Sequence, residues 1–178
     1  VTRLRQLIDD GAELAVVVCG KRSAYIETTH EVFRREATKY YAELEVVEDL
    51  LAVDDGILKI AIYDFVDAEA TAPLLDAVRT THQVVVSGHH WIDIMNQGVN
   101  KGVALERLQT ALGITAAQTV AFGDYLNDLE MMDAADLSFA MAHAHPDIHA
   151  RARYAAPSNH EQGVLTTIRT LLDGSFER

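Results

Sequence analysis

The 178-residue chain has one cysteine, three prolines, one tryptophan and few basic residues. With Cys19 alone, no disulfide can form within the chain, which fits a reducing compartment such as the cytoplasm. Because Cys19 lies in an apolar run, we expect a buried core thiol rather than a nucleophile. The net charge of −12 argues against a general nucleic-acid binder. No apolar run is long enough to span a membrane.

Hydrophobic residues are plentiful, at 49% of the chain, and segments with strand and helix periodicity alternate, which predicts an α/β fold. The first half resembles a small α+β unit, with a hairpin around Gly20 and a helix over residues 30–42. We place the boundary between Met95 and Asn100, which gives domains of residues 1–95 and 96–178.

The second half has short apolar strands separated by helices, a pattern typical of a parallel sheet. "TVAF" and "LSFAM" are the clearest strands. The preceding helix ends at Gly113. Its expected buried stripe consists of Ala104, Leu105, Leu108, Ala111 and Leu112.

An acidic turn follows the strand "TVAF". Asp124, Asn127 and Asp128 crowd into it directly after Gly123. Ligands of open parallel sheets bind beyond the carboxyl ends of the strands, and Mg²⁺ prefers oxygen ligands. The alternative is that one of these residues caps the next helix, although capping explains one residue and not three.

Lys101 lies at the start of a helix, with Asn100 as the expected N-cap. The helix dipole disfavours a cation at that end. The lysine is explained if an anion such as phosphate docks at the same point. The alternative is a solvated surface lysine.

These segments together resemble a known family. "SGHHWIDIMNQGVNKGVALERL", "TVAFGDYLNDLEMMDAADLSFAM" and "SNHEQGVLTTI" are similar to the haloacid dehalogenase superfamily, and in particular to Cof-type sugar-phosphate phosphatases with a large α/β cap. The resemblance implies a cap at residues 1–95 and the later strands of a Rossmann-like parallel sheet at residues 96–178. It also implies a Mg²⁺-dependent phosphatase that acts through an aspartyl-phosphate.

The same resemblance assigns roles to four residues. Lys101 matches the lysine that steadies the phosphate and the nucleophile, and Asp124 matches the Mg²⁺ ligand. Asn127 and Asp128 match the residues that support the phosphate and the lysine. The implied substrate is a small phosphorylated metabolite such as a sugar phosphate.

One feature of the family pattern is absent. Its nucleophile belongs to an Asp-x-Asp motif before the cap, and no two aspartates of this sequence are two residues apart. We therefore expect the C-terminal portion of a longer phosphatase, and no activity of the isolated chain. The strand "TVAF" would then have an unpaired edge, able to pair with the missing segment or with another chain.

Two other hypotheses stay open. His143, His145 and His149 form an H-x-H-x3-H pattern that could bind zinc, although spacing alone is weak evidence without a fourth ligand. A chain without a nucleophile could also be a non-catalytic module that binds phosphate ligands or a partner. His143 and Tyr125 depart from residues common in the family, which affects substrate details more than the class.

Overall fold

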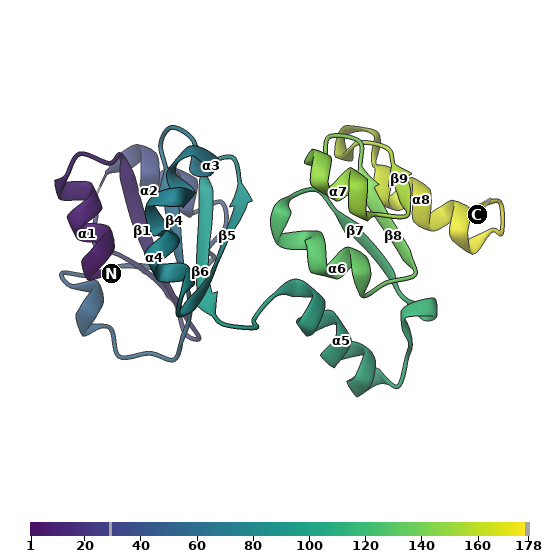
Figure 1. The fold of residues 1–178 in the computed structure, drawn as a ribbon, viewed down its shortest axis with the longest axis horizontal. Coiled ribbons are helices and arrows are strands. Elements are labelled where there is room, and N and C mark those ends of the chain that lie inside the picture. Colours follow the sequence, from purple (N-terminus) through teal and green to yellow (C-terminus); the bar gives the residue numbers. More distant parts are fainter. Residues whose placement is uncertain (29, 177–178) are drawn as a thin grey trace. The chain divides into compact units, whose positions relative to one another are not determined.

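The computed structural model describes residues 1–28 and 30–176, in which the chain forms two compact units, Val1–Gln97 and Gly98–Arg178 (Figure 1). We call them unit 1 and unit 2. Unit 1 contains a sheet of six strands and unit 2 a sheet of three. The predicted α/β class is confirmed. None of the described helices is both long and apolar enough for a membrane span.

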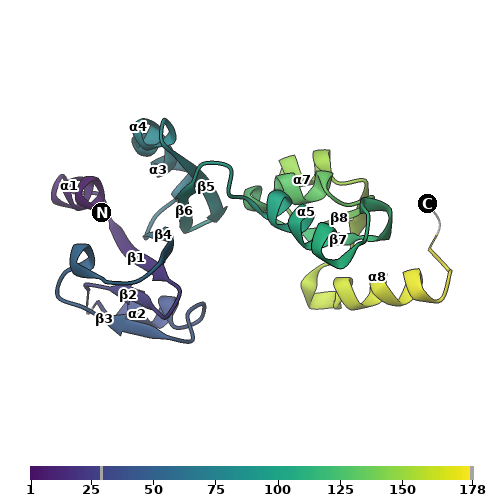
Figure 2. The ribbon, with the colours of Figure 1, turned by 90° about the horizontal axis from the view of Figure 1, so that it is seen from below.

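Unit 1 is a mixed sheet with helices on both faces. Its strands lie in the order β3-β2-β1-β4-β6-β5, and only the β2–β3 pair is parallel. Figure 2 shows α1, α3 and α4 on one face and α2 on the other. The elements are α1 (Thr2–Asp9), β1 (Leu14–Gly20), β2 (Ala24–Ile26), α2 (Glu31–Ala37), β3 (Leu44–Val46), η1 (Leu50–Ala52), β4 (Ile57–Asp64), α3 (Ala68–Thr71), η2 (Ala72–Leu75), α4 (Asp76–Arg79), β5 (His82–Gly88) and β6 (Trp91–Asn96).

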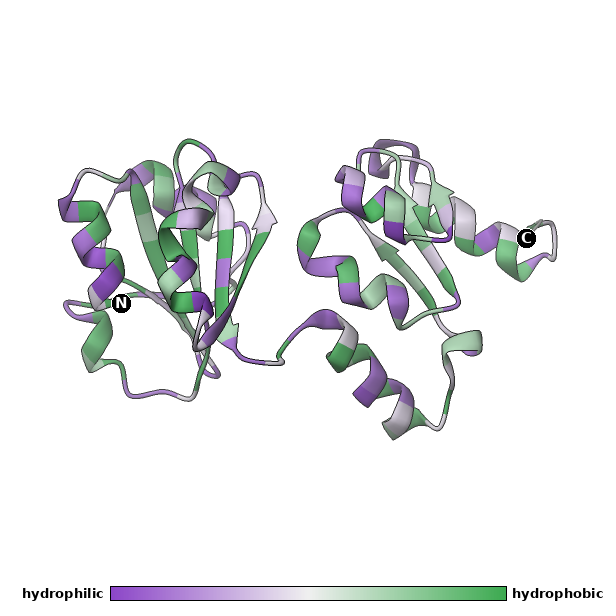
Figure 3. Ribbon diagram, in the orientation of Figure 1, coloured by the Kyte–Doolittle hydropathy of each residue, from purple (hydrophilic) through white to green (hydrophobic). Residues whose placement is uncertain are grey.

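The core of unit 1 follows from strand alternation. Val17 of β1 pairs with Ala61 of β4, and both are fully buried in one cluster with Phe33 of α2. Figure 3 shows mostly hydrophobic residues along these central strands. The predicted hairpin between β1 and β2 is confirmed, and Cys19 is buried as expected.

Two details of unit 1 differ from the sequence prediction. Helix α2 ends at Ala37, so the predicted helix over residues 30–42 is too long. The following residues form a turn that leads into β3, a strand that the sequence pattern did not reveal. Tyr40 and Tyr41 therefore lie beyond the helix, beside Trp91.

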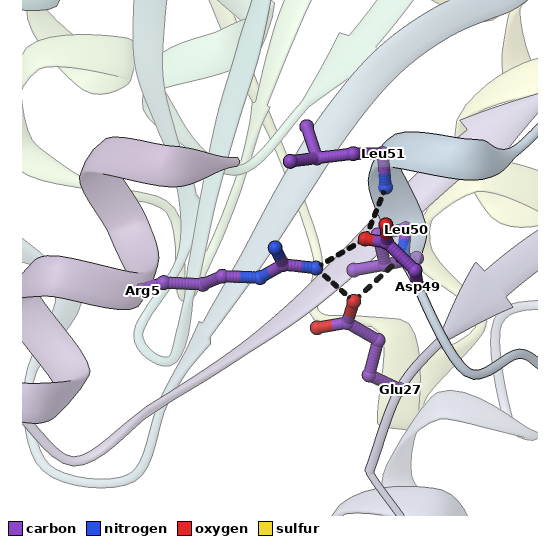
Figure 4. Close-up of polar contacts among 5 residues, drawn as sticks. All are labelled: Arg5, Glu27, Asp49, Leu50 and Leu51. Atoms are coloured by element: carbon purple, nitrogen blue, oxygen red, sulfur yellow. Dashed lines mark hydrogen bonds and ion pairs between the residues drawn. The ribbon is translucent and has the colours of Figure 1, made fainter.

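An ionic network ties α1 to the loop before η1 (Figure 4). The Arg5 guanidinium contacts Glu27 and donates a 2.6 Å hydrogen bond to the Asp49 carboxylate. Both carboxylates also accept backbone N–H groups, of Leu50 and Leu51 respectively. The hydrogen bond from Arg5 is the main reason that the pKa of Asp49 lies below its ordinary value.

Unit 2 is built on a parallel sheet in the order β7-β8-β9, as the short apolar strands predict. Helix α5 ends at Gly113, whose left-handed φ of 68° confirms the predicted stop. The elements are α5 (Lys101–Leu112), η3 (Ala116–Gln118), β7 (Val120–Gly123), η4 (Leu126–Asp128), α6 (Leu129–Asp133), β8 (Leu137–Met141), α7 (Pro146–Arg151), β9 (Tyr154–Ala156), η5 (Asn159–Glu161) and α8 (Gly163–Leu172).

The apolar residues of α5 and α8 are only partly covered. Leu105 packs against the core, but Leu108 is 53% and Leu112 62% exposed, so the predicted buried stripe of α5 is largely wrong. On α8, Leu165 is 53% and Leu172 83% exposed. In the described part of the chain β7 pairs with β8 alone, so its other edge is open. Unit 2 thus has uncovered apolar helices and a free strand edge.

Candidate active site

The N-terminus of α5 carries the first predicted site residue. The Asn100 side chain accepts a 2.8 Å hydrogen bond from the Val103 N–H, so Asn100 is the N-cap, as the sequence indicates. Lys101 follows as the first helical residue, and its ammonium group forms an ion pair with the carboxylate of Asp128. The lysine therefore faces the acidic turn and is held there by an opposite charge, although half of its side chain is exposed.

Close backbone packing fixes α5 beside the acidic turn. A Cβ atom added to Gly102 would lie 2.6 Å from the backbone oxygen of Glu130 on α6, and equally close to its Cβ. At such distances a side chain fits only if the backbone of α5 or α6 shifts. Gly102 is the direct neighbour of Lys101, so its contact with α6 brings the lysine within reach of Asp128.

Asp128 is the central residue of the site. It is buried, at 4% exposure, and one carboxylate oxygen contacts Lys101 while the other accepts a 3.0 Å hydrogen bond from the backbone N–H of Asp124. The N–H of Tyr125 lies 3.5 Å from the same oxygen. A Cβ on Gly123 would approach the Asp128 Cβ to 2.8 Å, so only glycine lets the turn close around this side chain.

Asp124 lies at the open side of the turn, with 54% of its side chain exposed. Its carboxylate is 3.5 Å from Nε2 of His143, and its backbone oxygen accepts a 2.8 Å hydrogen bond from the N–H of His145. The sequence did not reveal the contact with His143. A signal for it exists, because His143 closely follows β8, the parallel neighbour of β7, and the carboxyl ends of neighbouring parallel strands meet at one edge.

The structure thus links Lys101, Asp128 and the backbone of Asp124 in one network. Asn127 lies in the same turn and is half-buried, but no hydrogen bond joins its side chain to these three within residues 1–28 and 30–176. The burial of Asp128 separates its role from that of Asp124. Asp128 holds the lysine and the turn together, while the exposed carboxylate of Asp124 is available to a ligand.

The site fits a magnesium ion as far as this chain's donors go. Mg²⁺ is usually held by one or two carboxylates, with waters and substrate phosphate completing the shell. Asp124 offers one exposed carboxylate of this kind. Three or more His, Cys, Asp or Glu side chains do not gather into a metal-binding group anywhere in the described residues. In the histidine pattern, His145 caps α7 by accepting from Asp147, while His143 contacts Asp124.

The comparison with protein families identifies the family to which this chain belongs. The model of haloacid dehalogenase-like hydrolases matches residues 2–168. The chain therefore belongs to the haloacid dehalogenase-like hydrolase family, and the predicted resemblance is confirmed.

Among relatives, the 5-amino-6-(5-phospho-D-ribitylamino)uracil phosphatase YbjI of Escherichia coli is 34% identical over 163 residues, which are 90% of this chain and 60% of that protein. Among solved structures, SMU.1108c from Streptococcus mutans is 28% identical with a TM-score of 0.84, covering 97% of this chain and 66% of that one. The sugar phosphatase BT4131 is 17% identical with a TM-score of 0.77, covering 95% and 64%, and shows the fold alone. The chain spans about 60% of the length of its relative YbjI.

Proposed function

We propose that this chain is part of a Mg²⁺-dependent phosphatase of small phosphorylated metabolites, with unit 1 as its cap and unit 2 as part of its catalytic core. The carrying observation is the bridge through Asp128, which joins the Lys101 ammonium to the backbone of the turn that presents Asp124. The bridge holds a cationic group, Lys101, and the proposed metal ligand, Asp124, close to the carboxyl end of β7. Phosphoryl transfer requires such a pair of groups around the phosphate.

The proposed roles follow from burial and charge. The half-exposed Lys101 neutralises charge on the phosphate, and the buried Asp128 orients this lysine. Asp124 ligates Mg²⁺, and Asn127 contributes a polar side chain to the phosphate. Bound magnesium would supply Lewis-acid neutralisation of the phosphate oxygens. His143, which contacts Asp124, orients the carboxylate for this task.

The nucleophile in this proposal comes from a strand beside β7. The sequence contains no Asp-x-Asp, and β7 has an open edge in the described residues. The exposed leucines of α5 and α8, Leu108, Leu112, Leu165 and Leu172, provide apolar surface that such a segment would cover. The isolated chain is accordingly proposed to be inactive. Its cytoplasmic location remains a prediction.

The test combines this chain with a nucleophile-bearing segment. The purified chain is assayed with p-nitrophenyl phosphate and with 5-amino-6-(5-phospho-D-ribitylamino)uracil, alone and after coexpression with the N-terminal portion of the E. coli relative. We expect no turnover by the chain alone and Mg²⁺-dependent turnover by the complex, lost in Lys101→Ala and Asp124→Ala. Mg²⁺-dependent turnover by the chain alone would contradict the missing-nucleophile proposal. An inactive but well-formed complex would contradict the proposal that this chain is part of a phosphatase.

A second candidate is a non-catalytic module that binds a partner chain. The open edge of β7 and the exposed leucines of unit 2 favour it. Sedimentation of the purified chain separates the two candidates. A stable dimer that is unaffected by the coexpressed segment supports the module, whereas a complex of one chain with one segment supports the phosphatase.

A further inference from the structure

Unit 1 contains a cavity of about 480 Å³ between α1, β1 and η1, and the described residues that line it all belong to this unit. Volumes of about 300–1,000 Å³ are typical of small-molecule sites. Arg5 of α1 and Glu27, which follows β2, both line the cavity, and their contact links α1 to the end of β2 (Figure 4). We call it the α1 cavity.

The buried residues that line the α1 cavity are apolar. Leu14 and Val16 lie two residues apart on β1, so their side chains share one face of the sheet. Both are buried, as is Leu50 of η1. The half-buried ring of Phe65 also lines the cavity, and it meets the ring of His30 edge to face, with 5.3 Å between the centroids. The cavity can therefore take up an apolar body, either aromatic or aliphatic.

The charged side chains at the cavity are predominantly acidic. The Arg5 guanidinium is already balanced by two carboxylates, because it contacts Glu27 and donates a hydrogen bond to Asp49. Glu27 accepts Arg5 and the N–H of Leu50 through the same oxygen, Oε1, which leaves its Oε2 without a partner in the described part of the chain. Glu13 is an exposed lining residue, and it forms no ion pair with any other described residue. Both Glu13 and Glu27 can therefore accept hydrogen bonds from a cationic ligand.

We propose that the α1 cavity binds a small amphiphilic organic cation, a molecule with an apolar body and one ammonium group. The body would occupy the space beside Leu14, Val16 and Leu50, and the ammonium group would lie near Glu13 and Glu27. The same carboxylates repel a phosphate or carboxylate group, because like charges disfavour each other. The ligand is therefore not a phosphorylated compound, and the inference does not depend on the proposed phosphatase function.

Three compounds of matched size and different charge test the proposal. The intact 178-residue chain is titrated with 4-phenylbutylamine, 4-phenylbutanol and 4-phenylbutyrate, and the methyl resonances of Leu14, Val16 and Leu50 are followed by NMR. We expect saturable shifts with the amine, weaker binding of the alcohol and the weakest binding of the carboxylate.

The titration is performed at about pH 9 because the Val1 amine also lines the cavity. Burial is the main reason that the pKa of this amine lies below its ordinary value of 8.0, so the amine is uncharged under these conditions. An alkylammonium ligand, like a lysine side chain, keeps its charge up to about pH 10. The preference for the amine then reports the carboxylates alone.

Two charge variants separate the local effect of Glu13 from the net charge of the chain. Glu13→Gln keeps the side-chain volume and should weaken binding of 4-phenylbutylamine about two- to fivefold, with little effect on 4-phenylbutanol. Glu43→Gln makes the same change at an exposed residue that is not among those lining the cavity, and it should bind all three compounds as the wild type does. Circular dichroism verifies that each variant is folded.

Three outcomes would overturn the inference. One is binding of 4-phenylbutyrate that is as tight as binding of the amine. Another is amine binding that Glu13→Gln leaves unchanged. The third is the absence of saturable methyl shifts with the amine, including the case in which the same methyl groups respond only to dilution of the chain, because a second copy would then cover the cavity. None of these readouts uses turnover by the coexpressed complex, so their failure leaves the proposed function standing.

Discussion

The contact between Gly102 and Glu130 gives the sharpest prediction for unit 2. In Gly102→Ala the new methyl would lie 2.6 Å from the backbone oxygen and 2.7 Å from the backbone carbon of Glu130. Because backbone atoms cannot rotate away as a side-chain end can, α5 must move. Overpacking costs about 1–3 kcal/mol, and the better helix propensity of alanine returns up to about 1 kcal/mol. The net loss of stability therefore lies between about 0 and 3 kcal/mol, with a midpoint near 1.5 kcal/mol.

The same displacement should disturb the ion pair of Lys101 with Asp128. Two measurements follow it: hydrogen exchange of unit 2 amides for stability, and the amide chemical shifts of Asp124 and Tyr125, whose N–H groups approach the Asp128 carboxylate. We expect faster exchange and shifted resonances in Gly102→Ala.

Gly113→Ala is the matched control. Its added methyl would meet no atom within 4 Å, and its cost of about 1–2 kcal/mol comes from the left-handed backbone alone. Gly113→Ala should lower stability without changing the amide chemical shift of Asp124. The reasoning is refuted if Gly102→Ala is as stable as the wild type with unchanged Asp124 and Tyr125 resonances.

Four other predictions concern single side chains. Asp128→Ala removes the buried acceptor of the Asp124 N–H and should lower the free energy of unfolding by about 1–3 kcal/mol. Urea unfolding followed by circular dichroism measures this loss, and a smaller loss would contradict the bridging role of Asp128. Asp124→Ala, at an exposed side chain, should leave unfolding nearly unchanged while abolishing Mg²⁺-dependent turnover of the coexpressed complex. The pKa of Asp55 is lowered to about 2, mainly because its carboxylate accepts a hydrogen bond from the backbone N–H of Arg22. The ionised carboxylate therefore stabilises the folded chain fully above about pH 4, and this stabilisation is lost toward pH 2. The urea midpoints of the wild type and Asp55→Asn should converge over that interval, and a constant difference would refute the assignment. Leu112→Lys, at 62% exposure, should reduce binding of an apolar dye without lowering the unfolding midpoint, and a large loss of stability would show that this leucine is packed.

The sequence predicted the elements whose causes are local. Gly113 ends α5 because a left-handed residue favours glycine, and Asn100 begins it because its side chain accepts a helical N–H. The short apolar runs that form strands β7 and β8 are likewise visible in the sequence. The acidic turn was found in the same way, as polar residues following a strand.

Long-range packing accounts for the differences. The leucine periodicity of α5 predicted a buried stripe, but periodicity does not say whether any partner covers it, and Leu108 and Leu112 are exposed. Helix α2 ends early and β3 forms because β3 pairs with β2, a contact that no local pattern encodes. The contact of His143 with Asp124 depends on β7 and β8 being parallel neighbours.

By itself, the sequence determined the α/β class, the family resemblance and the identity of the charged residues near the turn, since each depends on local patterns and motifs. Only the tertiary structure decided which of those charged side chains is buried and which is exposed. It buries Asp128 between the lysine and the turn and leaves Asp124 open, because the close approaches at Gly102 and Gly123 allow backbone to pack where any side chain would intervene.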